Sequence, residues 1–372
     1  MKDNKKSNIL SPGLLAKRKS LSNTGVLLLI TVSLFVLLYI ISSFLFADSN
    51  FTKFTVFFNL FNNKAYLLML ALGLTVVIIT GSIDISVGAV TGLISMVIAS
   101  TLLAHGVSVI WTIPVSLGIG LAFGAVQGFL IAYMEIQPFI VTLAGMFFAR
   151  GMISVINSNS VPITNKTFLS WSSAKIYIPF LYNVRNNGTH DVAYLTPAAI
   201  IAITVLIVLI IVLKKTKFGR SLYAIGGNGQ SALLMGINVK KVKFQAHMLC
   251  GLLAGIGGIL YTLFAPSGNP GNGYGYEIDA ISSSVIGGAM LIGGVGLPIG
   301  TLFGVLINAL IERVVPLLGI VEASWPRIIT SAFLFAFIVI QSVFVSTSRK
   351  GGLRLQPLKL MKFKRYRRDL KL

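Results

Sequence analysis

Apolar residues gather in ten long runs along the chain, separated by short polar segments. A helix needs about 20 predominantly apolar residues to cross the hydrocarbon core of a bilayer, and the runs are close to that length. The pattern therefore predicts an all-α polytopic membrane protein with about ten transmembrane helices. Gly, Ser or Asp interrupts the second, third and eighth runs, which makes them candidate hinges or walls of a transport path. The runs lie near residues 25–46, 64–80, 85–104, 109–134, 139–157, 193–213, 243–265, 276–293, 297–316 and 324–346.

Basic residues divide the polar segments into two kinds. They are dense in the N-terminal tail (1–24), the loop 214–243 and the C-terminal tail (347–372), and sparse in the segment 158–192. Cytoplasmic segments of membrane proteins carry an excess of Lys and Arg, so we expect both termini and the loop 214–243 to be cytoplasmic. An even number of spans in the membrane domain 25–346 agrees with this, and it makes 158–192 a short external loop.

Composition supports the same class of protein. Hydrophobic residues make up 55% of the chain and charged residues 11%, with a mean hydropathy of +0.86, whereas a soluble domain carries about 25% charged residues. The net charge of +21 would also suit a nucleic-acid binder. Its division among three clusters separated by apolar spans fits membrane topology instead, so we expect contact with anionic membrane lipid and no nucleic-acid partner. Cys250 is the one cysteine, so no disulfide forms within the chain.

The residue patterns that catalysis or metal binding would need are missing. No glycine run is followed by the Lys and Ser or Thr of a Walker A motif. The three histidines do not show the spacing of metal ligands, and no Ser-His-Asp or Cys-His arrangement stands out. We therefore expect no catalytic residue, no metal site and no enzymatic activity.

A few charged residues stand beside or within the apolar runs. On insertion scales a charge at a helix centre costs about 2.5–3.5 kcal/mol. A proton relay would need more carboxylates inside the bilayer than this chain has, which weakens the case for a proton-driven carrier. Asp84 precedes the third run, where helix N-capping near the cytoplasmic face is its first interpretation, and Asp279 opens the eighth run in the same manner. Arg150 either lies near mid-span or pairs with an acid. The charged residues are Asp84, Arg150, Glu277, Asp279, Glu312 and Arg313.

The chain is weakly duplicated, and its small residues recur at helical spacing. The stretches "ITGSIDISVGAV" (79–90) and "YEIDAISSSVIGGA" (276–289) both place Ile-Asp before a segment rich in Ser and Gly. They lie five spans apart, and an odd offset inverts the second copy, as in transporters built from inverted repeats. Glycines spaced by four residues allow close helix contact, and we favour packing within the chain over a subunit interface. They are Gly88 and Gly92; Gly120, Gly124 and Gly128; and Gly296, Gly300 and Gly304.

Four stretches resemble one family when taken together. "GSIDISVGAVTG", "TLAGMFFARG", "TKFGRSLYAIGGNGQSALLMGI" and "ISSSVIGGAMLIGGVGLPIGTLFGVLI" are similar to the permease subunit of bacterial sugar ABC importers, the family of the ribose permease. "TLAGMFFARG", "SVPI" and "YAIGGN" most resemble the second permease of a galactofuranose importer. The resemblance covers residues from about 60 to 345.

The resemblance carries expectations about function and partners. It implies a multi-pass subunit of the bacterial cytoplasmic (inner) membrane that binds no cofactor itself, with ATP and Mg²⁺ held by a separate ABC ATPase subunit. It also implies a second permease chain, identical or homologous, and an extracytoplasmic sugar-binding protein. The alternatives are a permease for another cargo (ribose, a nucleoside or a branched-chain amino acid), a stand-alone secondary carrier, and a structural subunit of a membrane complex.

The resemblance also implies a cytoplasmic coupling helix at about residues 229–237 that docks on the ATPase. Gly226, Gly227 and Gly229 allow a sharp turn, Asn228 suits a cap, and Gly236 suits a helix stop. An apolar side would enter a groove of the partner; alternatively, this helix packs on its own bundle. The expected coupling residues are Asn228, Gly229, Ser231, Leu233, Leu234, Met235 and Gly236. For a sugar path we expect Asp84, Phe147, Phe148, Asn269, Tyr274 and Tyr276, each of which also has a packing or turn interpretation.

Overall fold

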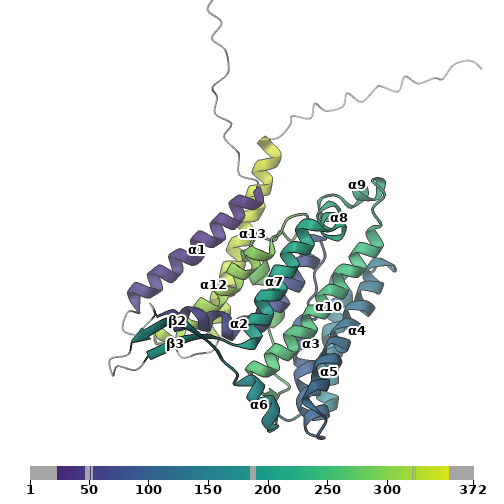
Figure 1. The fold of residues 1–372 in the computed structure, drawn as a ribbon. Helices are drawn as coiled ribbons and strands as arrows, with labels where there is room; N and C mark the ends of the chain where they lie inside the picture. The colour runs from purple at the N-terminus through teal and green to yellow at the C-terminus, as the bar shows by residue number, and fades with distance from the viewer. Residues whose placement is uncertain are drawn as a thin grey trace, which may run out of the picture.

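The computed structural model describes residues 23–46, 51, 53–184, 190–320, 322 and 324–351. The basic tails expected at 1–24 and 347–372 therefore lie almost wholly outside the described residues. All ten apolar runs form helices, which slant together through one bundle (Figure 1). The long helices are α1 (Asn23–Leu45), α2 (Phe54–Ile79), α4 (Thr112–Ala132), α5 (Pro138–Ile156), α7 (Pro197–Lys215), α10 (Val239–Phe264), α12 (Pro298–Leu317) and α13 (Trp325–Gly351).

Eight helices of the described chain are long and apolar enough to cross a membrane. The other two runs form shorter helices. One is α3 (Val87–Met96), which continues as the π-helical segment η2 (Val97–Leu103), and the other is α11 (Tyr276–Ile286). The protein is thus an all-α polytopic membrane protein, in which α11, with 11 residues, is too short to span by itself. The continuous helix Val87–Leu103 is at the lower limit of a span. The second run was also placed wrongly, because α2 begins ten residues earlier than expected and is unbroken.

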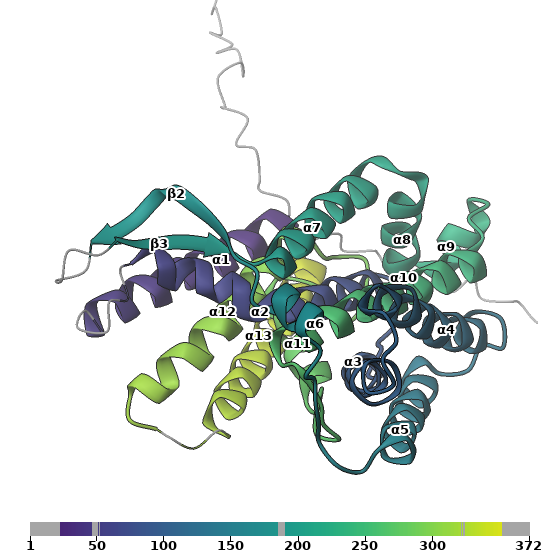
Figure 2. The ribbon, with the colours of Figure 1, turned by 60° about the horizontal axis from the view of Figure 1, so that its bottom comes forward.

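Eight of the helices form two adjoining rows with mirrored order. In one row α4 packs on α10, α10 on α2, and α2 on α12; in the other α5 packs on α3, α3 on α11, and α11 on α13. Figure 2 shows α3 and α11 between α5 and α13. If α2, α3, α4 and α5 change places with α10, α11, α12 and α13 respectively, each row contains the same neighbours in reverse order. This symmetry supports the predicted inverted repeat and extends it from two short motifs to two units of four helices.

Non-helical backbone interrupts each repeat after its long central helix. Residues 80–86 separate α2 from α3, and residues 265–275 separate α10 from α11, with a further break at 287–297 before α12. Irregular backbone at membrane depth is tolerated only where protein or a water-filled cavity surrounds it. Asn272 shows how one break is satisfied: its side chain is buried and donates to Ser95 Oγ and Ser267 O.

The glycine rows serve packing within the chain, as expected. Gly120 and Gly124 of α4 lie so close to Gly251 and its neighbours on α10 that an added Cβ would meet backbone atoms. Gly88 and Gly92 lie against the segment 272–277, Gly296 against Ile79, and Gly300 and Gly304 against Gly287 and Ser283. Small residues let membrane helices approach closely, since lipid offers no hydrophobic force to push them together.

The segment 158–192, expected to be a polar loop, has an ordered architecture. It forms strand β1 (Val161–Pro162), which pairs with β4 (Ser267–Gly268); helix α6 (Lys166–Ser172); and most of a hairpin of β2 (Ile176–Val184) and β3 (His190–Leu195). Asn62 of α2 anchors the hairpin, because its side chain donates to Tyr194 O and accepts from Thr196 N. Several apolar side chains of β2, Phe180 among them, are exposed.

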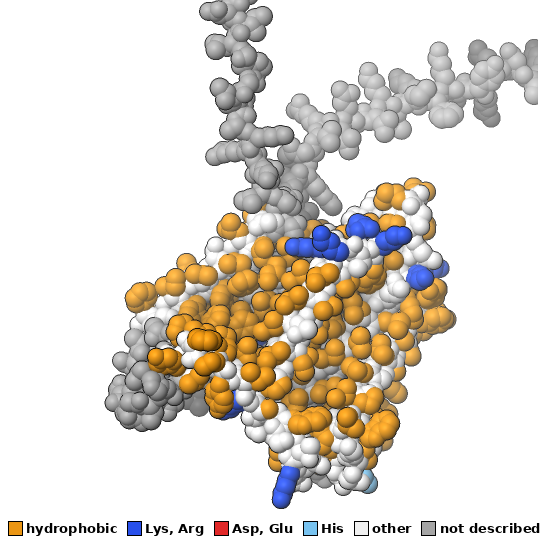
Figure 3. Space-filling model, viewed as in Figure 1, with side chains coloured by type: hydrophobic (Ala, Val, Ile, Leu, Met, Phe, Trp, Pro, Cys, Tyr) orange, Lys and Arg blue, Asp and Glu red, His pale blue; other side chains and the backbone are white. Residues whose placement is uncertain are grey.

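The two ends of the bundle differ as the charge pattern predicts. The start of α1 and the end of α13 lie at the same end as α8 (Lys217–Gly227) and α9 (Gly229–Leu234), whereas α6 and the hairpin lie at the other (Figure 1). On the face drawn in Figure 3, most Lys and Arg side chains gather beside α8 and α9. This arrangement fits cytoplasmic termini, which stay a prediction.

Two alanine substitutions on α4 test the close packing. Gly120→Ala should destabilise the protein by about 1–3 kcal/mol, because its Cβ would meet the backbone of Gly251 and Gly255. Gly118→Ala, two residues away, places its Cβ in open space and should leave stability unchanged or slightly raised. Thermal unfolding of the detergent-solubilised variants measures both. Equal melting temperatures would contradict the packing described.

Candidate functional site

Two short helices, α8 and α9, connect α7 to α10. Asn228 caps α9: its side-chain oxygen accepts from Ser231 N at 2.9 Å. After Met235 the chain turns through Gly236, whose φ of +81° is left-handed and suits glycine. The expected helix is therefore present, with its expected cap and stop.

The apolar side chains of this helix face outward. The exposed fractions of Leu233, Leu234 and Met235 are 62%, 89% and 68%, whereas Ala232 is buried. Three large apolar side chains in this state are typical of a surface that a partner covers. The alternative was that the helix packs its apolar side on its own bundle, but these three side chains are exposed. We call Leu233, Leu234 and Met235 the α9 tip.

Gly226 and Gly227 are not turn residues, contrary to expectation. Both lie in the last turn of α8, and Gly226 packs against Ile79 O and the backbone of Gly294. Gly294 N in turn donates to Ile79 O at 2.8 Å. Three backbone segments thus meet at Gly226: α8, the end of α2 and the break 287–297.

Tyr223 adds a side-chain bond to this junction. Its hydroxyl donates to Gly296 O at 2.7 Å, and burial raises its pKa to about 12, so it stays a protonated donor at physiological pH. Because the contacts are backbone to backbone, α8 cannot shift without moving the end of α2 and the segment leading into α12. Sequence reasoning missed this junction, since neither residue stands out before its distant partner is known.

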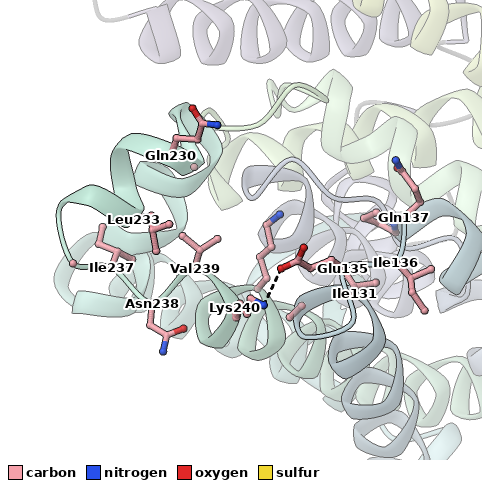
Figure 4. Close-up of a pocket in the computed structure, with 15 residues that line it drawn as sticks. Ile131, Glu135, Ile136, Gln137, Gln230, Leu233, Ile237, Asn238, Val239 and Lys240 are labelled. Carbon is pink, nitrogen blue, oxygen red and sulfur yellow. Dashed lines mark ion pairs between the residues drawn. The ribbon is translucent and has the colours of Figure 1, made fainter.

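A groove of about 750 Å³ lies beside α9 (Figure 4). Its walls come from α9, the start of α10, the end of α4 and the turn before α5. Lys240 and Glu135 form an ion pair across this site at 2.8 Å, and Lys240 lowers the pKa of the Glu135 carboxyl. Both residues are outside the expected coupling set.

Five of the six predicted path residues fall into three places. Asn269 and Tyr274 are exposed in the break 265–275. Phe147 and Phe148 are exposed on α5, and Phe148 lines a second, apolar pocket between α4 and α5. Tyr276, in contrast, is half-buried and turned against the rings of Tyr66 and Tyr261, which fits its packing interpretation.

Arg150 joins two of these places. From α5 its guanidinium donates to Asn272 O at 2.7 Å and lies over the Tyr274 ring, 5.3 Å from its centroid. Arg327 at the start of α13 donates to Tyr274 O at 3.1 Å. The break 265–275, α5 and the start of α13 therefore bring together an aromatic ring and two guanidinium groups, the kinds of group that bind sugar hydroxyls and ring faces.

Asp84 is buried away from that surface. One of its carboxylate oxygens accepts from the backbone N and the hydroxyl of Ser86, and the Ser86 hydroxyl contacts Gln127 on α4. The N-cap position of α3 is Ser86, whose side chain makes no cap bond, and Asp84 satisfies the Ser86 amide from two residues before it. Asp279 lies inside the first turn of α11, after Gly275 at the cap.

Comparison with known proteins identifies the family. A model described as "Branched-chain amino acid transport system / permease component" matches residues 56–341. The chain belongs to this permease family. No solved structure matches it.

Several curated relatives are similar over most of their length. The inner membrane ABC transporter permease protein YjfF of Escherichia coli K12 is 37% identical over 84% of this chain and 91% of its own. The fructose import permease protein FruG of Bifidobacterium longum is 34% identical over 84% and 89%, and the ribose import permease protein RbsC of E. coli K12 is 33% identical over 83% and 91%. The chain is thus a multi-pass permease component of the cytoplasmic membrane, and its relatives are transport proteins.

Neighbouring glycines test the junction at α8. Gly226→Ala should abolish uptake by the complete transport system, because its Cβ would overlap Ile79 O and Gly294 N and separate the three segments. Gly227→Ala meets nothing within 4 Å and should transport like the unmodified chain. Uptake of radiolabelled cargo, normalised to permease in the membrane, makes the comparison; full uptake by Gly226→Ala would contradict the junction's role.

Proposed function

We propose that the chain is the membrane-spanning permease subunit of an ATP-driven sugar importer, with galactofuranose or a related monosaccharide as its cargo. A separate ABC ATPase subunit binds ATP and Mg²⁺, and this chain binds no cofactor. A second permease chain, identical or homologous, completes the path, and an extracytoplasmic binding protein delivers the sugar.

The observation that carries this proposal is the exposed α9 tip on a fixed base. Burying a Leu or Met side chain is worth about 1.5–3 kcal/mol, so the α9 tip offers a partner several kcal/mol of apolar contact. Its base at Gly226 and Tyr223 contacts the end of α2 and the break before α12. A force on α9 therefore reaches elements of both repeats, as alternating access requires.

Cargo choice is supported by the relatives and by the surface around Tyr274. Two relatives carry ribose and fructose in their names, whereas the family description names branched-chain amino acids. The exposed Asn269 and Tyr274 with Arg150 suit a hydroxylated cargo better than an aliphatic one. Identifying the ligand that co-purifies with the cognate binding protein tests the cargo, and a branched-chain amino acid there would overturn it.

A stand-alone secondary carrier is the rival from another class. It requires no partner at α9, so the exposed apolar tip would have no function there. Reconstitution of the purified chain alone in liposomes separates the two: accumulation driven by an ion gradient would overturn the proposal.

Acidic substitutions at the α9 tip test the docking. The double variant Leu234→Asp, Met235→Asp should insert and fold normally, because both side chains are exposed, yet lose co-purification of the ATPase and stop uptake. Phe180→Asp is a control of equal exposure, 89%, at the opposite end of the bundle. It should retain the ATPase. Normal uptake by the double variant would contradict docking through α9.

A further inference from the structure

The groove beside α9 combines apolar walls with a charged rim. Leu233 of α9, Ile237 and Val239 face Ile131 and Ile136 from the end of α4 and the following turn. Figure 4 shows these side chains on opposite sides of the groove, with Lys240 and Glu135 between them. Its volume of about 750 Å³ is in the range of sites that enclose a drug-sized group, so it has room for several side chains.

The turn that forms one wall follows the end of α4. Glu135 has a φ of +56°, the only positive value outside glycine among the described residues. Helices commonly end on a left-handed residue, and the bond from Ile136 N to Leu130 O closes the turn in that way. This helix end places Ile136 on the groove wall.

The charges of the groove favour one class of occupant. Lys240 keeps Glu135 ionised, and the two neutralise each other. Lys243 lines the same groove and makes no ion pair within the described part of the chain. The rim therefore carries one uncompensated positive charge above apolar walls. This charge would repel the basic tails of this chain and would attract an anionic group.

We propose that the ATPase subunit inserts a ridge into this groove, with an apolar side chain between Leu233 and Ile136 and a carboxylate near Lys243. The inference rests on the proposed function, because it assumes the same partner that covers the α9 tip. Leu233 belongs to both surfaces, so the two contacts are continuous. α9 is then held from its tip and from its inner side, and the partner can pull it as well as push it.

Matched substitutions in nanodiscs that contain the complete permease test the proposal. Ile136→Asp and Lys243→Glu change groove residues, whereas Met134→Asp and Lys241→Glu make the same changes at neighbours that do not line the groove. We expect the two groove variants to weaken binding of the purified ATPase subunit at least tenfold and the two controls to change it less than threefold. Melting temperatures of all four variants, matched to the unmodified chain, exclude misfolding.

The outcomes separate this inference from the proposed function. If the groove variants bind like their controls while Leu234→Asp, Met235→Asp loses the ATPase, α9 docks by its tip alone and the inference is wrong. If that double variant also binds normally, the proposed coupling fails as well. If the groove effects appear only in nanodiscs with anionic lipid, a lipid headgroup is the occupant and the inference is wrong.

Thiol protection gives an independent measurement. Cys250 is buried and is the chain's one cysteine, so Ile136→Cys or Met134→Cys in a Cys250→Ala background presents a single reactive site. Added ATPase should slow maleimide labelling at position 136 at least fivefold and leave position 134 unchanged. Equal labelling rates at position 136 with and without the ATPase would overturn the inference.

Discussion

Close backbone approach at glycine is the constraint on which the structure depends. Lipid gives membrane helices no hydrophobic reason to associate, so this chain relies on van der Waals contact between backbones. Gly120 and Gly251 bring α4 and α10 together, and Gly300 and Gly287 bring α12 to the break after α11. The first contact joins one repeat to the other, and the second lies within the second repeat.

The same kind of contact joins three segments at the end of the bundle that carries α8 and α9. A side chain can change rotamer and absorb a displacement, but a backbone held against two other backbones cannot. Gly226 is in that position between Ile79 and Gly294, so α8 and the ends of both repeats form one unit. The break 287–297 contributes Gly294 to this unit, and the break 80–86 begins directly after Ile79. Neither break has the hydrogen bonding of a continuous helix.

The sequence predicted the long helices and the short helix α9 because both depend on local pattern. Apolar runs predict spans, and Asn228 and Gly236 mark a cap and a stop through their own backbone preferences. The start of α2 was not predicted because Asn62 and Lys64 are polar residues that interrupt the apolar pattern. Both are buried in the structure, where Asn62 bonds to β3 and Lys64 pairs with Glu312 of α12. These partners are far away in the sequence. The hairpin and the Gly226 junction were missed for the same reason. Their physical basis is a distant partner that no local pattern reveals.

The direction of force decides what the α9 surface must provide. A partner that only pushes needs a flat contact, but alternating access needs a return stroke in which the partner withdraws. Burial of the apolar tip alone would hold the partner by several kcal/mol of contact as it withdraws. Such a contact does not prevent the partner from sliding sideways off the tip. In the proposed arrangement, a ridge set between Leu233 and Ile136 would block sliding by shape, and Lys243 would add a charge contact that orients it. The turn at Glu135, closed by the bond from Ile136 N to Leu130 O, would then hold the second wall in place while α9 is pulled.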